Sequence, residues 1–123
     1  MVVRYLKTRN FSKWAKKEKL SDTLLSGIIA EFESGLYDAK ISGYLYKKRI
    51  GLVGRGKRAG ARTIIFYQQG TKLVFCLGFA KNNKVNLNRD EKRALDILSK
   101  ALLSFSDVEI KTYLKTGALV TIT

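Results

Sequence analysis

Apolar residues recur at helical spacing near both ends of the chain and at strand spacing in its middle. After a short strand over residues 2–6, we expect a short helix capped by Asn10 and a second helix that begins at Ser21 and stops at Gly35. Each helix carries one apolar stripe that we expect to be buried: Phe11, Trp14 and Ala15 in the first, and Leu24, Leu25, Ile28, Ile29 and Phe32 in the second.

The C-terminal part predicts two more helices. Asn88 with Glu91 three positions later is typical of a helix start, and Ser106 with Glu109 repeats that pattern for a short helix that Gly117 ends. Residues 118–123 then read as a terminal strand. The expected buried stripe of the first of these helices comprises Ala94, Leu95, Leu98, Ala101 and Leu102.

The middle of the chain predicts strands over residues 44–52, 61–68 and 73–80, the last two joined by a turn at residues 69–71. In the third strand, strict alternation places Leu73, Phe75, Leu77 and Phe79 on one face and Val74, Cys76, Gly78 and Ala80 on the other. Because both faces are apolar, we expect this strand to be central and covered on both sides.

These elements follow the order β-α-α-β-β-β-α-α-β. A chain of 123 residues without proline, linker or repeat predicts a single domain over residues 1–123. The expected fold class is α+β: a small domain in which an antiparallel sheet of about four strands packs with two N-terminal and two C-terminal helices.

The distribution of charge is the strongest indication of the kind of partner that the chain binds. The net charge is +14, and residues 39–89 hold twelve of the 24 Lys and Arg but no Asp or Glu. We therefore expect a carboxylate-free basic surface and a polyanionic partner, with nucleic acid favoured. A membrane is the weakest option, because no apolar run approaches the ~18 residues of a spanning helix. The absence of a signal-peptide pattern and the lone Cys76, expected to be an inert core residue, predict a cytoplasmic protein.

Two absences restrict the chemistry. The chain has no histidine, which removes His-dependent nucleophiles and most zinc sites, and no acid lies between Asp38 and Asp90. A metal site or a two-carboxylate site in the basic part is therefore not expected, nor is a small-molecule cofactor. Any catalysis must use Lys, Arg, Tyr, Ser or Thr.

Residues 54–60 are rich in glycine and cations, but the segment leads into a strand and lacks a Walker Lys-Ser/Thr pair, so nucleotide cofactor binding is disfavoured. A solvated hairpin loop is one interpretation. The other, which we prefer, is a loop that lets Arg55, Lys57 and Arg58 close on phosphates.

The run Lys47-Lys48-Arg49 lies in a predicted strand, so Lys47 and Arg49 should face one way and Lys48 the other. Such a run is often just the exposed face of an edge strand. Convergence argues otherwise, since Arg62 and Lys81 lie at the ends of the next strands and could meet the run at one cleft. Further candidates for RNA contact are Lys84, after the third strand, and Tyr46 and Tyr67, which could stack bases or simply pack.

With these residues in place, the chain resembles the RelE/HigB-type toxins of bacterial type II toxin–antitoxin modules, and most closely the HigB-like branch. Two motifs carry the resemblance: residues 54–64, which read GRGKRAGARTI, and residues 79–82, which read FAKN. The chain departs from the family pattern at Asn82, Asn83 and Leu87, where an arginine, an acid or a tyrosine is usual.

The resemblance implies helices on an antiparallel sheet, a ribosome-dependent mRNA endonuclease that inhibits translation, and a cognate antitoxin, expected to be a small helix-turn-helix protein. It also implies that Lys47, Lys48 or Arg49 act together with Arg62 and Lys81. Because RNA supplies its own 2′-hydroxyl nucleophile, such cleavage needs neither histidine nor metal. We expect Arg62 and Arg55 at the scissile phosphate, with Lys47, Lys48 or Lys81 as general base or phosphate clamp. Two alternatives stay open: a non-catalytic nucleic-acid-binding module and a ParE-like gyrase inhibitor.

Overall fold

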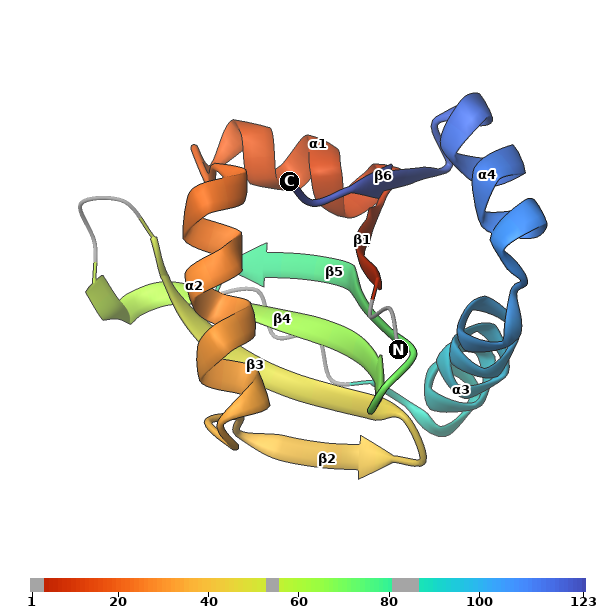
Figure 1. Ribbon diagram of the computed structural model, residues 1–123. Helices are drawn as coiled ribbons and strands as arrows, with labels where there is room; N and C mark the ends of the chain where they lie inside the picture. The colour runs from red at the N-terminus through yellow and green to blue at the C-terminus, as the bar shows by residue number, and fades with distance from the viewer. Residues whose placement is uncertain (1–3, 53–55, 81–86) are drawn as a thin grey trace.

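The computed structural model describes residues 4–52, 56–80 and 87–123 (Figure 1). Within these ranges the chain forms one six-stranded sheet in the order β2-β3-β4-β5-β1-β6, together with four helices. Neighbouring strands are antiparallel except β1 and β5, which run parallel. The elements are β1 (Arg4–Thr8), α1 (Arg9–Lys17), α2 (Asp22–Glu33), β2 (Ala39–Ser42), β3 (Leu45–Leu52), β4 (Gly56–Gln68), β5 (Lys72–Ala80), α3 (Arg89–Ser104), α4 (Asp107–Thr116) and β6 (Leu119–Thr121).

The sheet separates two hydrophobic cores. Figure 1 shows α2 crossing β3 to β5 on one side, with α3 and α4 together at another side of the molecule. The first core joins the sheet to α1 and α2, and the second joins it to α3 and α4. Their principal members are Phe11, Leu25, Ile29, Phe32, Ile65 and Phe75 in the first core, and Leu6, Ile64, Phe66, Val74, Leu102 and Ile110 in the second. The expected α+β fold with two pairs of helices is confirmed.

Most helix boundaries follow the predicted capping residues. The Asn88 side chain accepts a hydrogen bond from the Glu91 N–H at 2.8 Å, and Ser106 with Glu109 forms a complete capping box. The prediction that Asn10 caps α1 is wrong. Thr8 does so instead, because β1 runs directly into α1 and the Thr8 hydroxyl accepts from the Phe11 N–H at 3.1 Å.

The sheet is larger than the sequence pattern suggested. A short additional strand, β2, pairs with β3, so β3 is an internal strand and not an edge. The strand β4 begins at Gly56, where Gly56 pairs with Leu52. Much of the predicted glycine-rich loop is therefore β-strand, and residues 53–55 lie outside the described part of the chain.

An irregularity in β5 reverses the faces that strict alternation predicts. Ile64 pairs with Leu77 but Ile65 pairs with Phe75, so Cys76 is an extra residue opposite β4. As a result Phe75 packs in the core on the α1/α2 side, whereas Leu77 packs on the α3/α4 side. The predicted single row from Leu73 to Phe79 is thus wrong beyond Phe75. The shift turns Phe79 to the same side of the sheet as α3.

Burial of Cys76 gives a chemical prediction. The loss of hydration raises the pKa of its thiol to about 12, because the charged thiolate is disfavoured in the core. At pH 8 we expect no measurable alkylation by iodoacetamide in the folded protein. Unfolding in urea should restore the thiol to ordinary reactivity, which mass spectrometry would show as one added carbamidomethyl group. Rapid modification of the folded protein would contradict the described burial.

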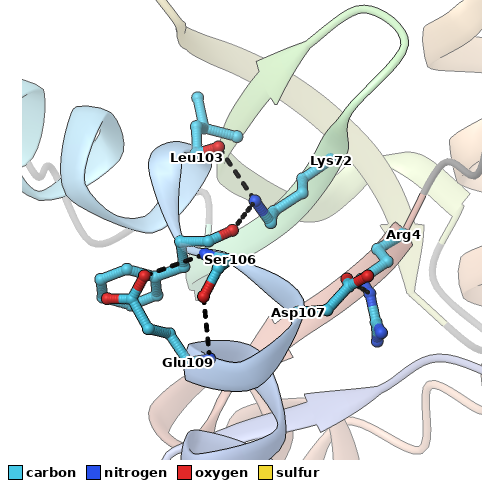
Figure 2. Close-up of polar contacts among 7 residues, drawn as sticks. Arg4, Lys72, Leu103, Ser106, Asp107 and Glu109 are labelled. Atoms are coloured by element: carbon cyan, nitrogen blue, oxygen red, sulfur yellow. Dashed lines mark hydrogen bonds and ion pairs between the residues drawn. The ribbon is translucent and has the colours of Figure 1, made fainter.

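The junction between α3 and α4 is anchored to the sheet by polar contacts (Figure 2). The Lys72 Nζ donates to the carbonyl oxygens of Leu103 at 2.9 Å and of Phe105 at 2.7 Å, so a cation meets the negative end of α3. Burial lowers the pKa of Lys72. On β1, Arg4 pairs with Asp107 at 3.1 Å. These contacts tie the end of α3 and the junction to β5, and the start of α4 to β1.

The predicted buried stripe of α3 is only partly right. Leu102 is buried and Leu95 is half-buried, but Ala94, Leu98 and Ala101 are exposed. The helix instead buries Ser99 and Leu103 beside Leu102. The sequence pattern could not distinguish these alternatives, because apolar residues cover more than one face of this helix.

Candidate functional site

Lys47, Arg49 and Arg62 lie on the same face of the sheet. Lys47 and Arg49 are two residues apart on β3, so their side chains point the same way. Arg62 on β4 is the direct cross-strand partner of Arg49, and directly opposed residues share a face. The predicted alternation of the Lys47-Lys48-Arg49 run is confirmed, and Arg62 lies on the face that Lys47 and Arg49 share. The predicted meeting with Lys81 falls outside the described residues.

A carboxylate holds the two arginines together. One oxygen of Asp38, Oδ2, lies 3.2 Å from the Arg49 Nε and 3.3 Å from the Arg62 Nη1. The backbone N–H of Asp38 donates to the Lys47 carbonyl oxygen at 2.9 Å, which places the residue beside β3. The shared carboxylate fixes two guanidinium groups side by side, where their like charges would otherwise drive them apart.

Asp38 was not among the residues that the sequence suggested, and it corrects the expected carboxylate-free surface. It is the last acid before the basic block, and the chain folds back at this point so that β2 pairs with β3. Its position directly before a strand was the available signal. The distribution of charge along the sequence does not reveal this ion pair, because Asp38 and Arg62 are 24 positions apart.

A cavity of about 400 Å³ opens on the same face. Lys47 and Lys92 bring positive charge to it. Lys92 is the fourth residue of α3 and is not among the residues predicted from the sequence. Since Lys47 is two residues from Arg49, the cavity lies about 7 Å along the strand from the arginine pair. The other described residues that line it are apolar: Ala39, Ile41, Ile64, Phe79 and Leu87.

Lys48 lies on the opposite face of the sheet from Lys47 and Arg49. Its contacts there are incompatible with the predicted role beside Arg62. Its side chain is buried, with 3% of the residue exposed. The Lys48 Nζ donates to the Leu36 carbonyl oxygen at 2.8 Å and lies 3.0 Å from the Glu31 Oε1. These contacts tie β3 to α2 and to the segment after it, so Lys48 has a structural role and we leave it out of the site.

Tyr46 and Tyr67, predicted to stack bases, also face α2 and not the arginine pair. Their rings pack against Phe32 in edge-on geometry, with centroids 5.1 Å and 5.0 Å from the Phe32 centroid. The reason is the same alternation that separates Lys48 from Lys47. We therefore do not include the two tyrosines in the site.

Five other predicted residues lie, in whole or in their side chains, outside the described part of the chain. Arg55, Lys81 and Lys84 lie outside the described residues. Lys57 and Arg58 belong to β4, but their side chains are outside the described part as well. The described site therefore consists of Lys47, Arg49 and Arg62 together with Asp38 and the cavity.

In the described ranges, no group of three or more His, Cys, Asp or Glu is arranged to hold a metal ion. Over the same residues, no helix is long and apolar enough to cross a membrane.

Comparison with protein families agrees with this architecture. The family described as the RelE toxin of the RelE / RelB toxin-antitoxin system matches residues 3–122. A search of curated proteins found no match. The family match spans the whole sheet and all four helices, and it includes the strands that carry Lys47, Arg49 and Arg62. The chain therefore belongs to the RelE toxin family of toxin–antitoxin systems.

Proposed function

We propose that this toxin is an endoribonuclease that cleaves messenger RNA on the ribosome and thereby inhibits translation. The observation that carries the proposal is the arginine pair, Arg49 and Arg62, held by Asp38 beside a cavity that Lys47 lines. Family membership supports the same reading, since toxins of this family typically act as translation-inhibiting endoribonucleases. The cognate antitoxin would suppress the activity.

The arginine pair supplies a binding site for the scissile phosphate. A guanidinium has five N–H donors, and within the described residues each arginine directs one nitrogen toward Asp38, which leaves further donors for a phosphate. Two guanidinium groups against one carboxylate leave a net charge of +1 at this point. That charge favours the phosphodiester and, more strongly, the additional negative charge that develops on phosphorus in the transition state.

The nucleophile comes from the RNA itself. The 2′-oxygen attacks the adjacent phosphorus, the bond to the 5′-oxygen of the next nucleotide breaks, and the products carry a 2′,3′-cyclic phosphate and a 5′-hydroxyl. A base must accept the 2′-hydroxyl proton and an acid must protonate the leaving oxygen. We assign one of these transfers to Lys47, because it lines the cavity next to the arginine pair. Lys81, which the family resemblance implicates, remains the candidate for the other.

The cavity suits a nucleotide base next to that phosphate. Its apolar lining includes Phe79, whose ring would stack on a base, and the cations Lys47 and Lys92 also line the cavity. The approximate 7 Å offset along β3 matches the reach of a nucleotide from phosphate to base. Cleavage without a metal ion is part of the proposal.

Cleavage of a synthetic messenger RNA bound in the ribosomal decoding site tests the proposal. We expect products with a 2′,3′-cyclic phosphate, and 2′-deoxy substitution at the cleaved nucleotide should abolish cleavage, because the nucleophile is then missing. The same substitution one nucleotide away is the matched control and should leave cleavage nearly unchanged. Cleavage of the 2′-deoxy substrate would overturn the mechanism. A toxin that binds RNA but never cuts it would support the non-catalytic alternative.

A further inference from the structure

The helix α3 exposes a continuous apolar stripe. Ala94, Ile97, Leu98 and Ala101 are all exposed, with 63% of Ile97 and 43% of Leu98 accessible. Their spacing of i, i+3, i+4 and i+7 places them on one side of the helix over about two turns. We call these four residues the α3 stripe.

The α3 stripe is distinct from the face that α3 packs against the sheet. That face contains Leu102 and Leu103 in the core and buries Ser99. Lys92, which lines the cavity, is also on the far side of the helix from the stripe at 100° per residue. The α3 stripe therefore faces away from the proposed cleavage site, and neither the core nor the site accounts for it. Exposed apolar side chains that adjoin in this way mark an interaction surface.

We propose that the α3 stripe is a docking surface for an amphipathic helix of the cognate antitoxin, with acidic residues along one flank of that helix. Membership of a toxin–antitoxin family provides the partner. Spacing at i, i+3, i+4 and i+7 on the toxin suits a helix that carries its own apolar stripe at the same period.

Charge around the stripe determines the chemistry of the partner. At 100° per residue, Arg89, Arg93 and Lys100 follow one flank of the stripe, whereas Asp90 and Glu91 lie at the start of the helix, where acids complement its dipole. Asp96 already pairs with Lys100 at 3.4 Å, which leaves Arg93 as the central cation of the flank. An acidic flank on the partner would complement it. A second copy of this chain would bring another +14 of charge and is disfavoured.

The position of the stripe has a consequence for inhibition. Because the stripe and the cavity are on opposite sides of α3, the docked helix anchors the antitoxin without occupying the arginine pair. A stripe variant should therefore lose antitoxin affinity but retain RNA cleavage. This separates failure of the inference from failure of the proposed function.

The test compares Ile97→Glu with Val108→Glu. Val108 is a matched control, since it is an apolar residue of α4, 73% exposed, and lies outside the stripe. Each toxin is purified with its antitoxin, separated under denaturant, refolded, and titrated with the antitoxin by biolayer interferometry. We expect Ile97→Glu to weaken binding by at least about 30-fold, as for a central interface residue, and Val108→Glu to change it by less than about threefold. Circular dichroism checks the fold of both.

A second variant addresses the charged flank. Arg93→Glu should weaken binding, and the difference from the wild type should shrink as salt is raised, because an exposed charge pair is screened. Equal affinities for Ile97→Glu and Val108→Glu would overturn the proposal. So would a toxin that dimerises without antitoxin and becomes monomeric with Ile97→Glu, since the stripe would then bind a second copy. Hydrogen exchange of the complex that protects another surface and leaves α3 unprotected would also overturn it.

Discussion

Replacing Arg62 by alanine is expected to lower RNA cleavage by about 10²–10³ and to abolish growth inhibition, while the protein still folds. The proposed transition state gathers negative charge on phosphorus, and Arg62 is one of two guanidinium groups that Asp38 holds toward it. The Arg62 side chain is 27% exposed and its ion pair with Asp38 lies at the sheet surface, so its loss should cost the core little. Single-turnover cleavage and induced expression in a host without antitoxin measure the two effects.

Arg4→Ala is a closely matched control for that variant. Arg4 also lies on a strand and pairs with an aspartate, Asp107, at 3.1 Å, and its side chain is 28% exposed. It belongs to β1, whereas Arg49 and Arg62 are on β3 and β4. We expect Arg4→Ala to cleave at nearly the wild-type rate. If Arg62→Ala is folded and fully toxic, Arg62 has no part in the site.

Lys47→Arg is expected to keep RNA affinity within a few-fold but to lose cleavage by about 10²–10⁴, the usual contribution of general acid–base catalysis. Arginine preserves the charge that binds phosphate, but its pKa exceeds about 12, so it cannot exchange a proton near neutral pH. Binding would be measured with a 2′-deoxy RNA that cannot be cut, and cleavage with the matching all-RNA substrate. A wild-type rate in Lys47→Arg would remove proton transfer from Lys47 and leave it as a phosphate clamp.

Three further lysine-to-arginine variants show whether the loss of cleavage is specific to Lys47. Lys40→Arg is the matched control, because Lys40 is an exposed lysine on β2 that packs over the Tyr46 ring, on the other face. Lys48→Arg should lower stability in urea, since the larger head group must fit the buried position beside Glu31, but should not change the rate per folded molecule. Lys81→Arg tests the second proposed proton transfer. If all three of Lys47, Lys48 and Lys81 tolerate arginine, the mechanism relies on electrostatics alone.

Local signals in the sequence were sufficient for much of the fold. The capping patterns at Ser21, Asn88 and Ser106 each involve residues three positions apart, and the structure confirms all three. The cap at Asn10 failed because Thr8 competes for the same helix start, and the end of β1 already positions it. Short-range hydrogen bonds explain both the successes and the error.

Part of the site was predictable for a similar reason. Side chains on a strand alternate with period two, so the separation of Lys48 from Lys47 and Arg49 follows from the sequence once the strand is recognised. That Arg62 faces Arg49 depends in addition on the register of β3 and β4, which the pattern of apolar residues on both strands restricts. The same alternation places Tyr46 on the face opposite Lys47.

The sequence by itself thus determined the order of the elements apart from β2, the strongly basic middle of the chain and the face shared by Lys47 and Arg49. Only the tertiary structure decided which acid pairs with which cation. Asp38 pairs with Arg62 and Glu31 pairs with Lys48, and in each pair the two residues are distant in the chain. The tertiary structure also decided the reversal of faces at Cys76 and the side of α3 that is buried. The physical reason is that a strand or helix with two apolar faces has no local preference between them, so long-range packing selects the one that is covered.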